Sequence, residues 1–382
     1  VLNGGGFDLT KIGINELVFI ETTINNLDKL IISEGEVRSE TRSQYPFATN
    51  VVNGFPLGNP ASTPLPLADY PHTILSSTNI AGGIDLVYAG QTADPLNTLF
   101  QTPIVGARLD LFRQHGAHHT ANITSFGAAS GTGGSYLELN SDTLPKVYTF
   151  WDGNINLTGL VDGSNTFFNI EAGGAGLGVG NTVLGTLNPD GDQVVNPTSM
   201  LIVQGAITGN GGVTKIGSRE LRLTGDNTFT GDFVVNRQTN NAQPLDPAQN
   251  ESYANGWGAS LYGQGTLAGT SNIVLERRGM LRVINHNLFD GTNVNGAGTT
   301  NLGANLTDRI NDSATLKLRD GWLIFDSGNN DVTETLGILR PETGMSFIVG
   351  NLQDGSNRDT NLTVTSFDRQ AGSVLTFTSW DS

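Results

Sequence analysis

Residues 209–236 read GNGGVTKIGSRELRLTGDNTFTGDFVVN. Short apolar segments alternate here with turns bounded by glycine. The tetrapeptide Thr-Lys-Ile-Gly at 214–217 also occurs at 10–13, 204 positions earlier, within the segment NGGGFDLTKIGINELVF of residues 3–19. A strand-and-turn unit that recurs in this way indicates a repeat architecture.

The composition favours strands and turns over helices. Glycine accounts for 50 of the 382 residues, and only 15% of the residues are charged, against about 25% in typical globular proteins. Asn, Thr and Ser take the surface positions that Lys and Glu usually hold, and these residue types suit strands and turns. We therefore expect little helix.

Charge, hydropathy and cysteine content argue against several classes of protein. The formal net charge of −16 would repel a phosphate backbone, because nucleic-acid affinity depends largely on Lys and Arg. No run of about 18 apolar residues is present, so we expect no membrane span in this segment. The lack of cysteine excludes disulfides and thiolate zinc sites.

Strand-sized apolar runs divide the chain into three regions. Residues 1–37 contain such runs at 17–20 and 30–32, which predict short strands. Residues 38–144 are rich in proline and contain few such runs, so we expect an insertion or elaborated coils there. Residues 145–382 regain the rhythm of one strand about every 8 to 12 residues, interrupted by a predicted loop excursion at 237–256.

The segment 201–236 closely resembles the passenger-associated repeat of autotransporter-type surface proteins. It supplies, in order, a Gly-rich turn, a Thr-Lys-x-Gly step, a Leu-x-Leu strand, a Gly-x-Asn-Thr-aromatic-x-Gly turn at 225–231 and a Val-rich strand. Residues 301–312, 314–318 and 333–337 are also similar to autotransporter-associated β-strand repeats. The resemblance extends over about 200–382 and, in part, over 1–37.

This resemblance implies an all-β chain folded as a right-handed parallel β-helix (β-solenoid) with irregular loop insertions. The physics agrees, because a short strand buries its apolar face only when the next coil stacks about 4.8 Å away. We expect Asn227 to form an amide ladder between coils, and Lys11 and Lys215 to belong to the coil rather than to a site. At roughly 20 to 25 residues per coil, the chain would make about 15 to 19 coils and a rod of roughly 70 to 90 Å, shorter if residues 38–144 are an insertion.

Two groups of residues are candidates for metal binding. His115, His118 and His119 are clustered, and clustered imidazoles can ligate zinc, copper or nickel. Asp190 and Asp192 lie two positions apart in a turn and could contribute to a calcium site. A polar loop with several histidines and a plain Pro-Asp-Gly turn explain the same residues. We therefore predict no metal site and no cofactor.

Arginines on an outer face could serve an enzyme that cleaves acidic polysaccharides. Arg219 and Arg222 would point to opposite faces of a continuous strand, whereas Arg278 and Arg282, which follow Arg277, would share one face. Because no carboxylate is paired with them nearby in sequence, we interpret these arginines as a solvated face, although acids distant in sequence could still converge on them. No Gly-x-Ser-x-Gly or phosphate-loop motif is present, so we predict no catalytic residues.

The expected function is that of a non-enzymatic extracellular structural module at the bacterial cell surface, serving as a stalk, an adhesin or a self-associating filament subunit. Alternatives are a polysaccharide lyase or hydrolase on the same scaffold, or a tail-fibre-like receptor binder, because solenoids host both chemistry and adhesion. A glycan or another surface ligand is the expected kind of external partner.

The two ends of the predicted solenoid bear on its partners. Solenoids normally need capping elements, yet residue 1 begins within repeat-like sequence and the chain stops just after the strand-like segment 374–377. Uncovered strand edges pair with other chains. We therefore expect end-to-end self-association through the solenoid edges, or continuation into further repeats.

Overall fold

The computed structural model describes residues 1–40, 51–52, 55–56, 72–87, 106–112, 114, 116–126, 135–140, 148–158, 167–172, 200–216, 220–236, 258–284, 307–326, 331–352 and 359–381. Within these residues the chain forms strands and turns and no helix. Accordingly, no described helix is long and apolar enough to span a membrane.

Most strands belong to three sheets. Sheet I has eleven strands in the order β3 (Glu16–Ile20), β6 (Gly35–Glu40), β10 (Ala107–Phe112), β13 (Ser135–Asn140), β16 (Phe167–Ala172), β19 (Gly212–Ile216), β22 (Phe233–Asn236), β25 (Asn272–Glu276), β27 (Thr315–Arg319), β29 (Val332–Thr343) and β31 (Thr360–Phe367). Sheet II has nine strands: β11 (His118–His119), β14 (Tyr148–Trp151), β17 (Met200–Val203), β20 (Glu220–Leu223), β23 (Ala259–Leu261), β26 (Met280–Ile284), β28 (Trp322–Asp326), β30 (Met345–Leu352) and β32 (Val374–Asp381).

Sheet III has six strands: β2 (Leu9–Lys11), β5 (Leu27–Ile32), β9 (Ile80–Val87), β12 (Ile123–Phe126), β15 (Ile155–Thr158) and β18 (Ile207–Gly209). Two short parallel pairs join β1 (Leu2–Asn3) to β4 (Ile24–Asn25) and β21 (Asp226–Asn227) to β24 (Thr266–Leu267). A separate antiparallel pair joins β7 (Val51–Val52) to β8 (Phe55–Pro56).

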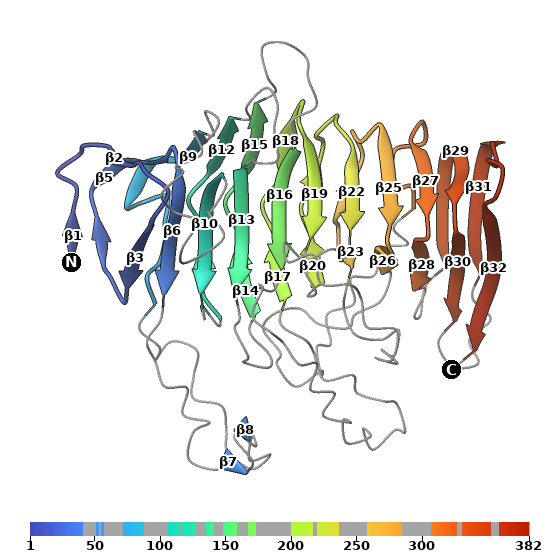
Figure 1. Ribbon diagram of the computed structural model, residues 1–382, viewed down its shortest axis with the longest axis horizontal. Helices are drawn as coiled ribbons and strands as arrows, with labels where there is room; N and C mark the ends of the chain where they lie inside the picture. The colour runs from blue at the N-terminus through green and yellow to red at the C-terminus, as the bar shows by residue number, and fades with distance from the viewer. Residues whose placement is uncertain are drawn as a thin grey trace.

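The chain visits the three sheets in turn. Strands β12, β13 and β14 lie in sheets III, I and II, and β15, β16 and β17 repeat this order one coil later. Neighbouring strands within each sheet are parallel. In Figure 1 the strands follow one another along the long axis, with the two termini at opposite ends. The structure therefore confirms the predicted all-β parallel solenoid.

The number of coils predicted from the sequence is wrong. We expected about 15 to 19 coils, whereas the longest sheet has eleven described strands. Some coils are short, since the hydrogen bond between Ile207 and Asn227 spans 20 residues. Others are long, since the bond between Arg38 and Asp110 on adjacent strands spans 72 residues. The number of residues per coil therefore varies, and eleven rungs at about 4.8 Å give a rod of about 50 Å.

Strands β9 to β13 fall within residues 38–144 and continue the same sheets. Strand β10 pairs with β6 on one side and with β13 on the other, and β13 pairs with β16. The expectation of few strand-sized runs in this region therefore gave too little weight to its strands. The proposed boundaries at 37 and 144 stay predictions, and the predicted excursion at 237–256 lies outside the described residues.

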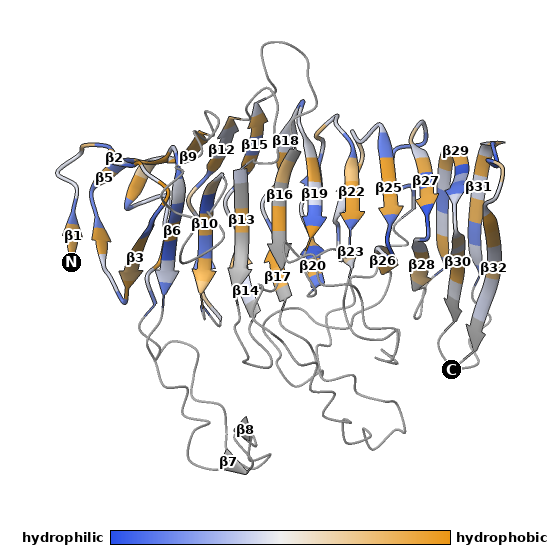
Figure 2. Cartoon of the chain, viewed as in Figure 1, coloured by the Kyte–Doolittle hydropathy of each residue, from blue (hydrophilic) through white to orange (hydrophobic). Residues whose placement is uncertain are grey.

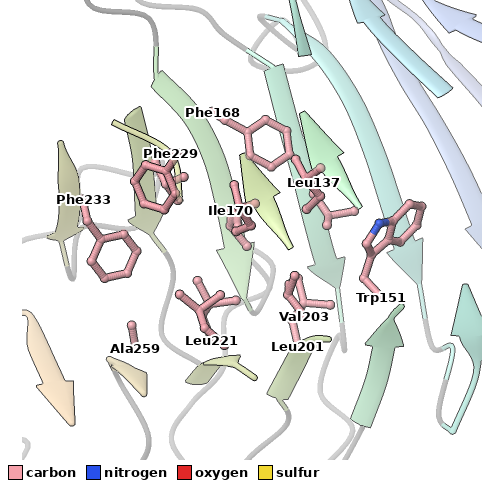
Figure 3. Close-up of a cluster of buried hydrophobic side chains, with 14 of the residues drawn as sticks. Leu137, Trp151, Phe168, Ile170, Leu201, Val203, Leu221, Phe229, Phe233 and Ala259 are labelled. Carbon is pink, nitrogen blue, oxygen red and sulfur yellow. The ribbon is translucent and has the colours of Figure 1, made fainter. Parts of the chain in front are cut away.

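The inward-facing side chains of the sheets form one continuous hydrophobic core. Leu221 of β20 pairs in register with Leu201 of β17, and both are fully buried. Figure 3 shows these side chains within a cluster of buried residues that also contains Phe168, Ile170 and Trp151. Each fully buried side chain of this size contributes about 1.5–3 kcal/mol. Figure 2 shows the corresponding alternation of apolar and polar residues along the strands of sheet I.

Lys11 and Lys215, the lysines of the two Thr-Lys-Ile-Gly copies, lie at different corners of the solenoid. Lys11 ends β2 of sheet III, whereas Lys215 lies near the end of β19 in sheet I. Each lysine is buried. The Nζ of each donates to the carbonyl of the isoleucine that follows, at 3.0 Å for Ile12 and 2.9 Å for Ile216. Both lysines therefore belong to the coil, where their ammonium groups bond the turning backbone.

Gly209 shows why these corners need glycine. Its φ is 104°, a conformation that residues with a Cβ rarely adopt. A Cβ at this position would also lie 2.0 Å from the carbonyl oxygen of Leu157 in the preceding coil. Close stacking of the coils therefore excludes a side chain here.

Asn227 joins three successive coils through its side chain. Its Oδ1 accepts from the N–H of Ile207 in the preceding coil at 2.9 Å. Its Nδ2 donates to the carbonyl of Thr266 in the following coil at 2.9 Å and to that of Gly225 at 3.0 Å. The expected ladder of stacked amides is replaced by bonds from one amide to the backbone of both neighbours.

The third side of the solenoid ends at Ile310. This residue forms a parallel bridge with Leu267 of β24. From β27 onward, the described strands alternate between sheets I and II only. The described part of the molecule is therefore three-sided before Ile310 and two-sided after it.

Replacing Asn227 by alanine should lower the free energy of unfolding by about 2–3 kcal/mol, because the change leaves buried backbone groups of two coils without their amide partner. Urea unfolding followed by circular dichroism measures this. Thr228→Ala, at the exposed next residue, is the matched control and should change stability by less than about 0.5 kcal/mol. Equal effects of the two substitutions would contradict the role given to Asn227.

Candidate functional site

Charged side chains on the outer face of sheet I gather around Arg38. Its guanidinium is 2.7 Å from Glu16 Oε1 on β3, 3.0 Å from Glu36 Oε1 on its own strand, and 2.7 Å from Asp110 Oδ2 on β10. It also lies over the ring of Phe112, 4.9 Å from the centroid. We call these five residues the Arg38 cluster. One arginine thus connects three successive rungs.

Burial sets the electrostatics of this cluster. Asp110 is fully buried. Burial acts to lower the pKa of Arg38, but Asp110, Glu36 and Glu16 together outweigh it and raise that pKa. Burial also raises the pKa of Glu16, with Arg38 opposing and Glu36 reinforcing the shift. A carboxyl with a raised pKa beside another acid can act as a proton donor, so this cluster is the candidate for acid–base chemistry on sheet I.

The same arrangement recurs near the other end of sheet I. Arg319 of β27 pairs with Glu276 of β25 at 3.3 Å and donates through Nε to Glu342 of β29. These interactions raise the pKa of Arg319, chiefly through the hydrogen bond to Glu342. An arginine between acids on the preceding and following rungs is therefore a repeated device for holding coils together.

A second cluster lies on the outer face of sheet II. Arg222 donates to Glu220 through Nε at 3.3 Å and Nη2 at 3.2 Å, and its guanidinium stacks over the ring of Tyr262 at 4.7 Å. Ser260 donates to the same carboxylate from the next strand. We call Glu220, Arg222, Ser260 and Tyr262 the Arg222 cluster. All four residues are buried.

The interpretation of Arg222 as part of a solvated face is wrong. Only 6% of Arg222 is exposed, and its carboxylate partner lies two positions away in sequence. Burial opposes ionisation of Glu220, but Arg222 and Arg282 outweigh this and hold its pKa below the ordinary value. A carboxylate held ionised in this way is a poor proton donor near neutral pH. The Glu220–Arg222 pair therefore stabilises the structure.

The other arginines singled out in the sequence do not form one site with Arg222. Arg277 and Arg278 are exposed in the turn before β26, with φ values of 52° and 64°. Because Arg278 lies outside the strand, alternation does not place it on one face with Arg282. Arg282 is half-buried in β26 and lies in register with Ser260. Arg219 lies outside the described residues.

The structure gives His118 and His119 opposite environments. His118 is exposed; its Nδ1 is 2.8 Å from Asp152 Oδ2, and its ring stacks on Phe150 with centroids 4.1 Å apart. His119 is fully buried, and its Nδ1 accepts from the N–H of Leu75 at 3.2 Å. Burial lowers the pKa of His119 to about 3, so it stays neutral. Adjacent strand residues face opposite sides, which prevents these two imidazoles from sharing a ligand.

The remaining metal candidates, His115, Asp190 and Asp192, lie outside the described residues. Within the part of the chain that the structure describes, no group of three or more His, Asp or Glu side chains is arranged to hold a metal ion.

The chain is similar in sequence to one bacterial surface protein. The chain is 30% identical over 254 residues to the adhesin BmaC autotransporter of Brucella suis biovar 1 (strain 1330). The resemblance to autotransporter-type repeat proteins is thereby confirmed. The match covers 63% of this chain but only 7% of the adhesin. No family model matches the chain, and no solved structure does.

The sequence did not reveal the Arg38 cluster, because its members are distant along the chain. Arg38 and Asp110 are separated by 72 residues, and only the register of β6 against β10 brings them together. Glu220 and Arg222 could have been paired from the sequence, since residues two apart on a strand point to the same face.

Replacing Arg38 by methionine should lower the free energy of unfolding by about 3–5 kcal/mol, because Asp110 would keep a buried charge without its counter-ion. Arg340→Met is the matched control, since Arg340 pairs at 2.8 Å with Asp368, whose side chain is 43% exposed. Its loss should be at most about 1 kcal/mol. Urea unfolding of both variants measures the difference, and similar losses would show that burial of Asp110 is not the cause.

Proposed function

We propose that this chain is a non-enzymatic, extracellular module of a bacterial surface adhesin, in which the solenoid serves as a stalk or as an adhesive surface. The observation that carries the proposal is the similarity over 254 residues to an autotransporter adhesin. The chain spans about 7% of that adhesin, so the proposal concerns a segment and not the activity of a whole protein.

The chemistry of the outer faces supports a structural or binding role. In the Arg38 cluster the charged groups contact one another across neighbouring rungs, and in the Arg222 cluster Ser260 bonds Glu220 of the preceding rung; both arrangements favour a rigid surface. Rigid scaffolds that expose long rows of side chains suit binding to extended ligands. An extracellular location at the bacterial surface follows from the same proposal.

Binding and cleavage can be separated with the purified chain. An adhesive surface should bind a subset of probes on an array of glycans and matrix proteins, and neither an adhesive surface nor a stalk should release product from the polysaccharides. Release of shortened or unsaturated sugars would contradict the proposal and favour a hydrolase or lyase. A trimer in solution would favour a tail-fibre-like receptor binder.

Three outward-facing substitutions distinguish an adhesive surface from a stalk. They are Lys317→Glu on sheet I, Arg282→Glu on sheet II and Thr124→Glu on sheet III, each at a half-buried position. If one face is adhesive, one of these variants should lose binding about tenfold or more on the same array while the other two serve as its controls. A stalk should bind no probe, and all three variants should behave as the parent chain.

We further propose that the chain associates with a second copy through the edge formed by β31 and β32. Phe367 and Phe377 occupy register positions opposite the core residues Leu339 and Ile348, yet they are 54% and 63% exposed. Exposed core-type side chains beside a strand edge favour pairing with another edge.

Light scattering and electron microscopy test this association. The chain should show a concentration-dependent increase in mass, and Phe377→Asp should return it to the monomer. Thr363→Asp, at an exposed position of β31, is the control and should leave the mass unchanged. A strictly monomeric parent chain would rule out self-association.

A further inference from the structure

The side chain of Glu334 closes the third side of the solenoid where its strands end. On this side, a backbone N–H of each coil donates to an acceptor of the next coil: Ile123 to Asn154 O, Ile155 to Ala206 O, and Leu267 to Arg309 O. The N–H of Ile310 has no strand of this side beyond it among the described residues. It donates instead to Glu334 Oε2 at 3.1 Å.

The contacts of Glu334 and Arg309 join the three-sided and two-sided parts of the molecule. Glu334 Oε1 also accepts from the N–H of Arg309 at 3.2 Å. The Arg309 side chain donates to the carbonyls of Gly265 at 3.0 Å and Ile284 at 2.8 Å. Glu334 is fully buried and Arg309 is 2% exposed. One carboxylate and one guanidinium therefore bond the segment 307–311 to β29 and to the preceding coil.

We propose that Glu334 and Arg309 form a pH-responsive closure that holds β29 onto the end of the third side and tightens on acidification. The closure stands on geometry, because a fully buried carboxyl group accepts from the N–H of Ile310, where a further strand would have supplied the acceptor, and from the N–H of Arg309. It is independent of the adhesin-type function proposed above.

The direction of the response follows from linkage. Burial raises the pKa of Glu334 from 4.5 to about 7, against the backbone hydrogen bonds from Ile310 and Arg309 and the charge of Arg309. The stabilisation that this raised pKa provides is fully present below the unfolded value of 4.5 and is lost as the pH rises through about 7. Burial lowers the pKa of Arg309 to about 10, so Arg309 stays charged throughout this window.

The charged groups that face Glu334 come from the segment packed against it. They are Arg309, which lowers the pKa of Glu334, and Asp308, which raises it. On the neighbouring strand β31, the residue in register with Glu334 is Leu362.

His119 responds to pH in the opposite direction, so a global unfolding curve would mix the two effects. Its pKa is lowered to about 3, and its contribution is present above the unfolded value of 6.5 and lost as the pH falls. His119 lies in β11, far along the chain from β29, which makes a segment-resolved measurement decisive.

Hydrogen exchange with mass spectrometry on the whole chain tests the closure. For peptides covering 307–312 and 331–343, the opening constant of the parent chain is divided by that of Glu334→Gln at the same pH. This ratio should be about 100-fold smaller at pH 5 than at pH 8. The comparison at equal pH cancels the intrinsic exchange rate. Asp312→Asn, at an exposed acidic residue of the same segment, is the matched control and should follow the parent chain.

Equal pH dependence of the parent chain and Glu334→Gln would overturn the proposal, as would an equal loss of pH dependence in Asp312→Asn. A second variant is informative even if Glu334→Gln does not fold. Asp308 is exposed and has a φ of 53°, which asparagine tolerates. Asp308→Asn should move the midpoint of the response to lower pH, and an unchanged or higher midpoint would count against the closure.

Discussion

Hydrogen bonds between the backbones of successive coils determine where the side chains of the core and of the outer faces lie. The parallel register places each strand residue above its counterpart in the coil before, about 4.8 Å away. Leu201 and Leu221 meet in the core for this reason, and Ile202 and Arg222 meet on the outer face. Rows of side chains along the axis are therefore the unit in which both the core and the surface are built.

The same register can place like charges next to each other on adjacent strands of the outer faces. Like charges stacked on adjacent strands destabilise a sheet, and this chain has 36 acidic against 20 basic residues. Arg38 and Arg319 each lie between acids on the preceding and following rungs. Each arginine thus relieves repulsion between two rungs and connects them, and an acidic solenoid can remain stacked.

Side chains also take over the hydrogen bonds wherever the backbone pattern breaks. Asn227 supplies the acceptor for Ile207 where β18 gives way to β21, and Glu334 supplies it for Ile310 where the third side ends. At corners, Lys11 and Lys215 supply donors instead of acceptors, since their ammonium groups donate to carbonyls of the turning chain. These four buried polar residues therefore lie at discontinuities of the coil.

The sequence by itself determined the solenoid, because the alternation of apolar residues, glycine corners and the repeat around Asn227 are local patterns that few other folds satisfy. It could not determine the number of coils, since the spacing between stacked residues varies from 20 positions for Ile207 and Asn227 to 72 for Arg38 and Asp110. Only the tertiary structure decided which distant charges meet, as Arg38 and Asp110 do, and where the third side ends. Both depend on register between strands, a property of the stacked coils that no single segment contains.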